Sequence, residues 1–145
     1  MIKEGESAPD FSATDQAGRT HRLFDYRGRW ILLYFYPKDN TPGCTAEACA
    51  IRDNFSAFSD LEAVVLGVSA DGAESHAKFA AKYRLPFILL SDTEKAISSL
   101  YEVSGLFKRA SYLISPELKI AKAYPRVKPE MHAVEVINDL KKLSA

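Results

Sequence analysis

Residues 30–49 read WILLYFYPKDNTPGCTAEAC, and they indicate the class of fold more clearly than any other segment. Its first seven residues, Trp30 to Tyr36, are all apolar or aromatic, which predicts a strand that is buried on both faces. Thr41 and Pro42 then favour a helix start, because threonine is a common N-cap and proline fits the first helical position. We therefore expect a central strand, a short loop and a long helix from Pro42 to about Phe58.

Strands and helices alternate outward from this stretch. The expected elements are a hairpin of 10–14 and 20–23, strands at 63–68 and 88–90, helices at 73–83 and 94–101, a second hairpin of 111–114 and 119–124, and a helix from Pro129 to Leu143 that buries Met131, Val134, Ile137 and Leu140 on one face. Alternation of this kind predicts an α/β protein. The expected architecture is thioredoxin-like, with a mixed central sheet flanked by helices and an N-terminal β-hairpin extension.

Composition limits the classes of function. The 145 residues, 47% hydrophobic and 26% charged, predict one globular domain over residues 1–145. The 19 basic and 19 acidic residues balance, so neither a nucleic acid nor an anionic membrane is an expected partner. The longest apolar run is far shorter than the roughly 20 residues of a membrane span, and the first residues do not resemble a secretory signal. We expect a cytoplasmic protein.

Cys44 is the candidate nucleophile. It falls in the first turn of the expected helix, where the helix dipole and unpaired backbone N–H groups favour a thiolate over a thiol. The loop before it follows the carboxyl end of a buried strand, where open α/β sheets place their sites. The structural alternative is a small buried core residue, which is a common role of cysteine.

Cys49 lies five residues after Cys44, which is about 140° further round a helix and about 7.5 Å along it. The Cα atoms would then be about 8.7 Å apart, whereas bridged cysteines rarely exceed about 7 Å. A disulfide between the two therefore requires the first turns of the helix to unwind. The spacing also excludes the C-x-x-C redox motif.

A metal site is not expected. Zinc usually takes four ligands, and His21, His76 and His132 are scattered without ligand spacing. We interpret His76 as a solvated helix residue.

The segment from Tyr34 to Cys49 resembles the active-site segment of the peroxiredoxins, in particular the bacterioferritin comigratory protein, or Q-type, subfamily. The similarity covers nearly the whole chain. It continues through residues 8–11 (APDF), 67–71 (GVSAD), 75–79 (SHAKF), 85–87 (LPF), 90–92 (LSD) and 109–114 (RASYLI).

The resemblance implies a role for six residues. Cys44 corresponds to the peroxidatic cysteine, and Cys49 to the resolving cysteine of those members that carry it five residues on. Thr41 corresponds to the hydroxyl that contacts the sulfur and the peroxide, and Pro37 to the residue that shields the pocket. Arg109 corresponds to the arginine that completes the site, and Glu47 to the carboxylate that holds it.

Each partner of Cys44 also has a plain structural interpretation. Thr41 is explained as a helix cap, Glu47 as an acid in the first turn, and Pro37 as a strand terminator. An arginine such as Arg109 is usually a solvated surface charge, and only the resemblance points to it.

The expected activity is a thiol-dependent peroxidase for hydrogen peroxide and organic hydroperoxides, acting through a sulfenic acid on Cys44 and a Cys44–Cys49 disulfide. The resemblance implies thioredoxin or a glutaredoxin-like protein as reductant. We expect no metal or organic cofactor, and a monomer. The alternative is a non-catalytic redox sensor or chaperone-like binding protein that uses the same disulfide as a switch. A sensor needs only the two cysteines, whereas a peroxidase also needs Thr41 and Arg109.

Overall fold

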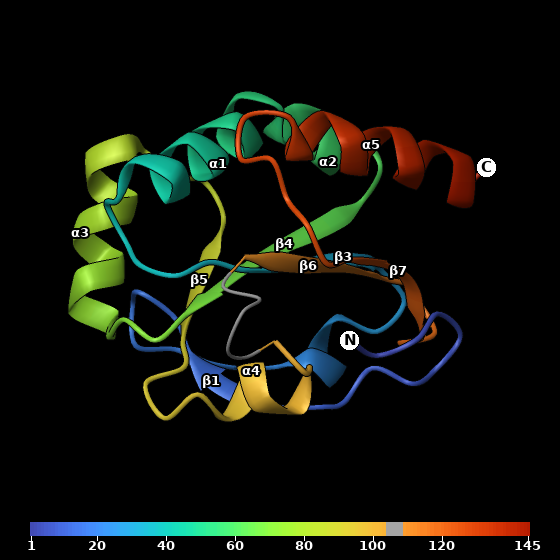
Figure 1. Cartoon of the computed structure of the whole chain (residues 1–145), viewed down its shortest axis with the longest axis horizontal. Coiled ribbons are helices and arrows are strands. Elements are labelled where there is room, and N and C mark those ends of the chain that lie inside the picture. Colours follow the sequence, from blue (N-terminus) through green and yellow to red (C-terminus); the bar gives the residue numbers. More distant parts are fainter. Residues whose placement is uncertain (104–108) are drawn as a thin grey trace.

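Five strands form one mixed sheet at the centre of the structure, a computed structural model that describes residues 1–103 and 109–145 (Figure 1). The strands are β3 (Trp30–Phe35), β4 (Ala63–Ser69), β5 (Ile88–Ser91), β6 (Ala110–Ile114) and β7 (Ile120–Tyr124). Their order is β5-β4-β3-β6-β7. Strands β3, β4 and β5 run parallel, β6 is antiparallel to β3, and β7 is antiparallel to β6. The predicted mixed sheet is confirmed.

The central strand β3 is buried on both faces, as its continuous apolar sequence predicts. Successive side chains of a strand point to opposite faces. Ile31, Leu33 and Phe35 accordingly join one hydrophobic cluster, and Leu32 and Tyr34 join the other. Two cores thus meet at β3.

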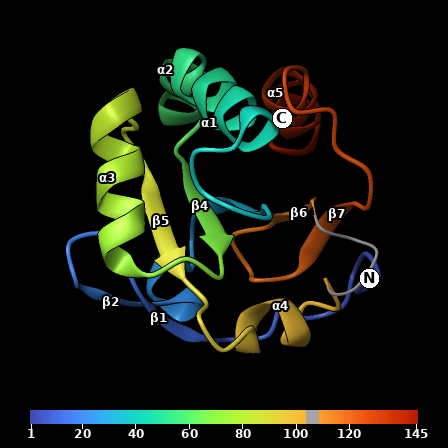
Figure 2. The ribbon, with the colours of Figure 1, turned by 60° about the vertical axis from the view of Figure 1, so that its left-hand side comes forward.

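Helices cover both faces of the sheet (Figures 1 and 2). On one face lie α1 (Pro42–Asp53), α2 (Phe55–Asp60), α3 (Ala73–Tyr83) and α5 (His132–Leu143). On the other lie α4 (Ala96–Leu100), the 3-10 helix η1 (Leu23–Tyr26) and the predicted N-terminal hairpin of β1 (Ser12–Thr14) and β2 (Thr20–Arg22). Within residues 1–103 and 109–145, no helix has the length and apolar character needed to cross a membrane.

The long helix expected from Pro42 to about Phe58 is interrupted at Asn54, where α1 ends and α2 begins. The Asn54 side-chain amide donates a hydrogen bond to the carbonyl of Ala50 at 2.8 Å. Asparagine side chains compete in this way with the backbone for helix carbonyls, which disfavours a continuous helix.

The prediction that four apolar residues of α5 are buried is right for two of them and wrong for the other two. Ile137 and Leu140 are buried, but Met131 is 63% and Val134 50% exposed. The helix begins at His132, whose ring Nε2 lies 2.9 Å from the Ser111 hydroxyl of β6. The buried stripe consists of Ala133, Val136, Ile137 and Leu140, which have the i, i+3, i+4, i+7 spacing of one helix face.

Candidate active site

The structure places Cys44 in the first turn of α1, as the sequence predicts, and its side chain is buried. Pro42 has no N–H, and the Thr45 amide donates to the Thr41 carbonyl at 2.8 Å. The amides of Gly43 and Cys44 precede this bond, so they have no acceptor within the helix. The positive end of the helix dipole is concentrated at these groups and favours negative charge on the sulfur.

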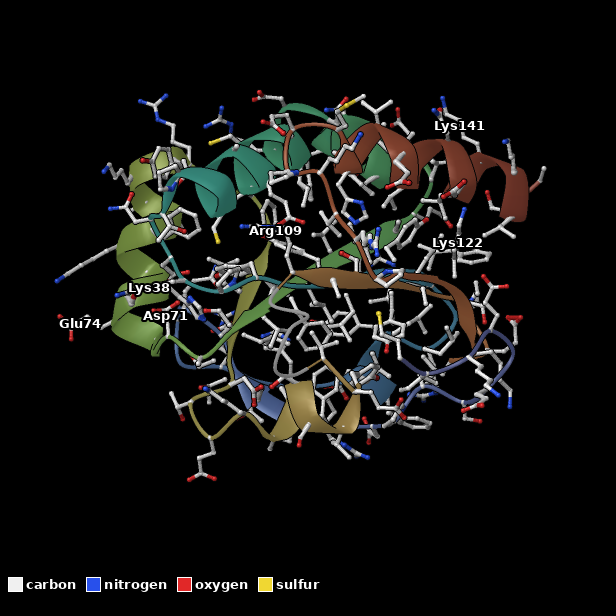
Figure 3. All side chains as sticks on the ribbon, viewed as in Figure 1. Lys38, Asp71, Glu74, Arg109, Lys122 and Lys141 are labelled. Atoms are coloured by element: carbon white, nitrogen blue, oxygen red, sulfur yellow. The ribbon has the colours of Figure 1, made fainter. Side chains whose placement is uncertain are left out.

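Sheet topology brings Arg109 to Cys44 although 65 positions separate them in the sequence. Strand β6 is antiparallel to β3, and Ala110 pairs with Phe35. The residue before β6 therefore lies where β3 ends and the chain turns toward α1. Figure 3 shows Arg109 between the sheet and α1, near the amino end of that helix.

The Arg109 guanidinium bridges two groups of α1. Its Nη2 donates to Cys44 Sγ at 3.4 Å, and its Nη1 donates to Glu47 Oε1 at 2.8 Å. Gly43 makes room for it, because a Cβ at this position would lie 2.9 Å from Nη2. Sequence reasoning placed Arg109 and Glu47 together through the resemblance, but missed this role of Gly43.

Glu47 is an acid in an apolar setting. Its side chain is 0% exposed, and burial raises its pKa to about 7 although the hydrogen bond and charge of Arg109 lower it. Its second oxygen, Oε2, has no hydrogen-bond partner among the described residues. Burial lowers the pKa of Arg109, but the bond to Glu47 and the contact with Cys44 outweigh it, so the net shift is upward. The guanidinium stays charged beside the sulfur.

Tyr34 is a second buried polar group on this side of the sheet. Its hydroxyl has no partner among the described residues, and burial raises its pKa far above the usual range, with the charges of Glu47 and Cys44 acting in the same direction. Sequence reasoning did not single it out. The alternation along β3 was the signal, since it places Tyr34 on the face that α1 covers.

Thr41 occupies the N-cap position of α1, but its hydroxyl caps no amide. It donates instead to the carbonyl of Lys38 at 2.9 Å. The capping interpretation of its side chain is therefore wrong, and the Thr41 oxygen keeps its lone pairs for a ligand. Pro37 is exposed and lies two residues after Phe35, the last residue of β3, in the loop to α1.

Cys49 lies on the same uninterrupted helix as Cys44, and both thiols are free. Cys49 is partly exposed, whereas Cys44 is buried. Helix geometry holds their Cα atoms about 8.7 Å apart, beyond the range of a disulfide.

His76 is buried, with 0% side-chain exposure, so its interpretation as a solvated residue is wrong. Both ring nitrogens have partners, the carboxylate of Asp39 at 2.7 Å and the carbonyl of Leu90 at 3.0 Å. These contacts compensate for the loss of water.

A buried thiol at a helix amino end, held by a cation, is the arrangement of a cysteine-dependent enzyme, here on a thioredoxin-like α/β fold. The AhpC/TSA family model matches residues 5–123. The chain is 42% identical to peroxiredoxin Bcp of Bacillus subtilis, with 99% of this chain and 98% of that protein covered. It is 38% identical to chloroplastic peroxiredoxin Q of rice (Oryza sativa subsp. japonica), with 98% and 68% covered.

Solved structures are similar over the whole chain. A cysteine-to-serine mutant of PrxQ from Xylella fastidiosa superposes with a TM-score of 0.93 at 32% identity, covering 100% of this chain and 99% of the other. The bacterioferritin comigratory protein of Xanthomonas campestris gives a TM-score of 0.91 at 30% identity, covering 99% and 100%. The chain belongs to the AhpC/TSA family as a peroxiredoxin of the Bcp/PrxQ type, and it is a thiol peroxidase.

Proposed function

We propose that Cys44 reduces hydroperoxides and that Arg109, Glu47, Thr41 and Pro37 form its site. The observation that carries this assignment is the Arg109 guanidinium, which contacts the sulfur and the buried Glu47 carboxyl with two of its nitrogens. A redox sensor would need only the two thiols. The bridging cation supports catalysis at Cys44 over the sensor alternative.

In the first step the Cys44 thiolate attacks the terminal oxygen of the hydroperoxide. An S–O bond forms, the O–O bond breaks, and the departing oxygen takes up a proton to leave as water or an alcohol. Negative charge develops on that oxygen, so fixed donors beside it lower the barrier. Arg109 and the free amides of the first turn are positioned to donate.

Thr41 and Pro37 shape the approach of the substrate. Because the Thr41 hydroxyl donates its hydrogen bond to the Lys38 carbonyl, its oxygen accepts a hydrogen bond from the hydroperoxide O–H. Pro37 limits the access of water from the loop side. The Xanthomonas campestris relative is described as having alkyl peroxide reduction activity, which supports organic hydroperoxides as substrates alongside hydrogen peroxide.

The second step joins the two cysteines. The Cys49 thiolate attacks the Cys44 sulfenic acid, an S–S bond forms, and the hydroxyl group leaves as water after protonation. Because α1 holds the Cα atoms about 8.7 Å apart, the first turns of α1 must unwind beforehand. Thioredoxin or a glutaredoxin-like dithiol then reduces the disulfide, and no metal or organic cofactor takes part. We propose that the chain acts as a single domain, as a monomer and in the cytoplasm.

Substitution of the nucleophile tests the assignment. Cys44→Ser should abolish peroxide turnover with a dithiol reductant, because a serine hydroxyl is not appreciably ionised near neutral pH. Cys49→Ser is the matched control, and it should still react once with peroxide. Turnover that survives in Cys44→Ser would remove Cys44 from the mechanism.

A further inference from the structure

The loop between β3 and α1 is bound to α3 through Asp39. The Asp39 side chain is 3% exposed, and its carboxylate contacts three donors. The Tyr36 hydroxyl lies 2.6 Å from Oδ1, and Oδ2 lies 2.8 Å from the Ser75 hydroxyl and 2.7 Å from His76 Nδ1. Ser75 and His76 belong to α3, so the loop that leads into Cys44 is held by a neighbouring helix.

Asp39 and His76 form a buried hydrogen-bonded pair. The ring Nε2 faces the carbonyl of Leu90 at 3.0 Å, which can only accept, and the ring Nδ1 faces the Asp39 carboxylate. Burial raises the pKa of Asp39, but the hydrogen bonds from His76 and Tyr36 outweigh burial and the net shift is downward. The Asp39 carboxylate is thus held by hydrogen bonds with Tyr36, Ser75 and His76, which join the loop to α3.

The backbone of the same loop has further anchors. The Asp39 amide donates to Asp71 Oδ2 at 2.9 Å, on the connection from β4 to α3. Asn40 has a left-handed backbone with φ of 59°, and its side-chain oxygen accepts from Tyr83 of α3 at 3.1 Å. Residues 39 and 40 are therefore fixed immediately before the N-cap of α1.

Asp39, Asp71 and His76 lie close enough together to hold a cation, with ligand atoms within 4.8 Å of one another. The hydrogen bonds already described engage each of the three groups. We therefore treat the cluster as an anchor for the loop and assign no metal to it.

We propose that the buried Asp39–His76 hydrogen-bonded pair stabilises the wound form of α1, the form that is helical from Pro42, and thereby sets the reduction potential of the Cys44–Cys49 couple. This inference rests on the proposed function, in which the dithiol belongs to the wound helix and the disulfide to an unwound one. His76 touches neither sulfur and acts as a positioning residue.

The effect follows from chain entropy. Fixing the backbone of one residue changes a conformational equilibrium by about tenfold, and the Asp39–His76 pair keeps residues 39–41 ordered before the first turn winds. Without it, winding must also order this segment, so the wound dithiol form loses stability relative to the unwound disulfide form. A tenfold change in this equilibrium makes the potential of the two-electron couple about 30 mV more negative.

The test is equilibration of the full chain with a small dithiol and its cyclic disulfide, followed by mass spectrometry of the trapped thiols. Two electrons and two protons pass between the Cys44–Cys49 pair and the small couple, so the ratio of forms gives the potential. His76→Gln should make the potential about 30 mV more negative than that of the wild type. Ser75→Ala, at a half-buried position, should move it in the same direction by a smaller amount.

The matched control is His21→Gln. His21 pairs with Asp15 at 2.6 Å in the N-terminal hairpin, so this variant loses a histidine–aspartate pair of the same type on the opposite face of the sheet. Its potential should equal that of the wild type.

An unchanged potential in His76→Gln, with a lowered free energy of unfolding, would overturn the inference and reduce His76 to a purely structural residue. If His76→Gln does not fold, the reduction potential of Ser75→Ala is used instead, and an unchanged potential in that variant would overturn the inference. A wild-type chain that forms no Cys44–Cys49 disulfide would instead overturn the proposed function, and this inference with it.

Discussion

Removal of the Arg109 guanidinium should slow the oxidation of Cys44 by about 10²- to 10³-fold. Its Nη2 lies 3.4 Å from the sulfur. At that separation two unit charges interact by about 5 kcal/mol at an effective dielectric constant of 20, and by about 1 kcal/mol in water. The Arg109 side chain is 19% exposed, so the interaction lies between these limits. The loss of one oxyanion donor elsewhere, about 3 to 4 kcal/mol, falls in the same interval.

The assay follows the first step alone. Arg109→Ala is made in a Cys49→Ser background, and stopped-flow mixing with hydrogen peroxide gives the second-order rate constant for Cys44. The rate constant of Arg109→Lys should lie between those of Arg109→Ala and the parent, because one ammonium group cannot reproduce the planar guanidinium that reaches both Cys44 and Glu47. A rate constant for Arg109→Ala within about threefold of its parent, in a folded protein, would refute the electrostatic reasoning.

Three further predictions concern the helix that carries the site. Gly43→Ala should lower the rate constant of Cys44 with hydrogen peroxide by about tenfold with little change in stability, because the new Cβ would lie 2.9 Å from Arg109 Nη2. Gly72→Ala is the control, because its Cβ would have nothing within 4 Å. In the wild type, the Glu47 carboxyl should lower the free energy of unfolding by up to about 3 kcal/mol as pH rises from about 4.5 to about 7. In this window the carboxyl of the unfolded chain has lost its proton, whereas the carboxyl of the folded chain, whose pKa is raised to about 7, retains it. Denaturant unfolding of Glu47→Gln should lack this component, and identical pH profiles for the two proteins would contradict it. Cys49→Ser should accumulate sulfenic and then sulfinic acid on Cys44 under peroxide, as mass spectrometry would show, and an intramolecular disulfide in that variant is impossible.

The order of elements could be predicted from the sequence because local patterns determine it. The run from Trp30 to Tyr36 is apolar at every position, and the structure buries both faces of β3. Helix α3 spans Ala73–Tyr83 as predicted, because its polar and apolar residues alternate with helical spacing. Asn54 shows the limit of such patterns, since the backbone leaves the helical conformation there within a stretch whose pattern predicts one continuous helix.

The site could be predicted only in part. Cys44 is identified by a local signal, a thiol beside a helix start. Arg109 is brought to it by the pairing of β6 with β3, which no local pattern encodes, and the resemblance alone pointed to it. His76 was assigned to solvent because its partners, Asp39 and Leu90, are remote in sequence and become neighbours only when α3 packs against the sheet.

If Cys44 and Cys49 join only when the start of α1 unwinds, amide hydrogen exchange of this segment should differ between the two redox states. Residues 41–49 should exchange slowly in the dithiol form and rapidly in the disulfide form, while β3 and β4 stay protected in both. A Cys44–Cys49 disulfide within a segment that remains protected would contradict the account, as would a dithiol form that already exchanges rapidly there.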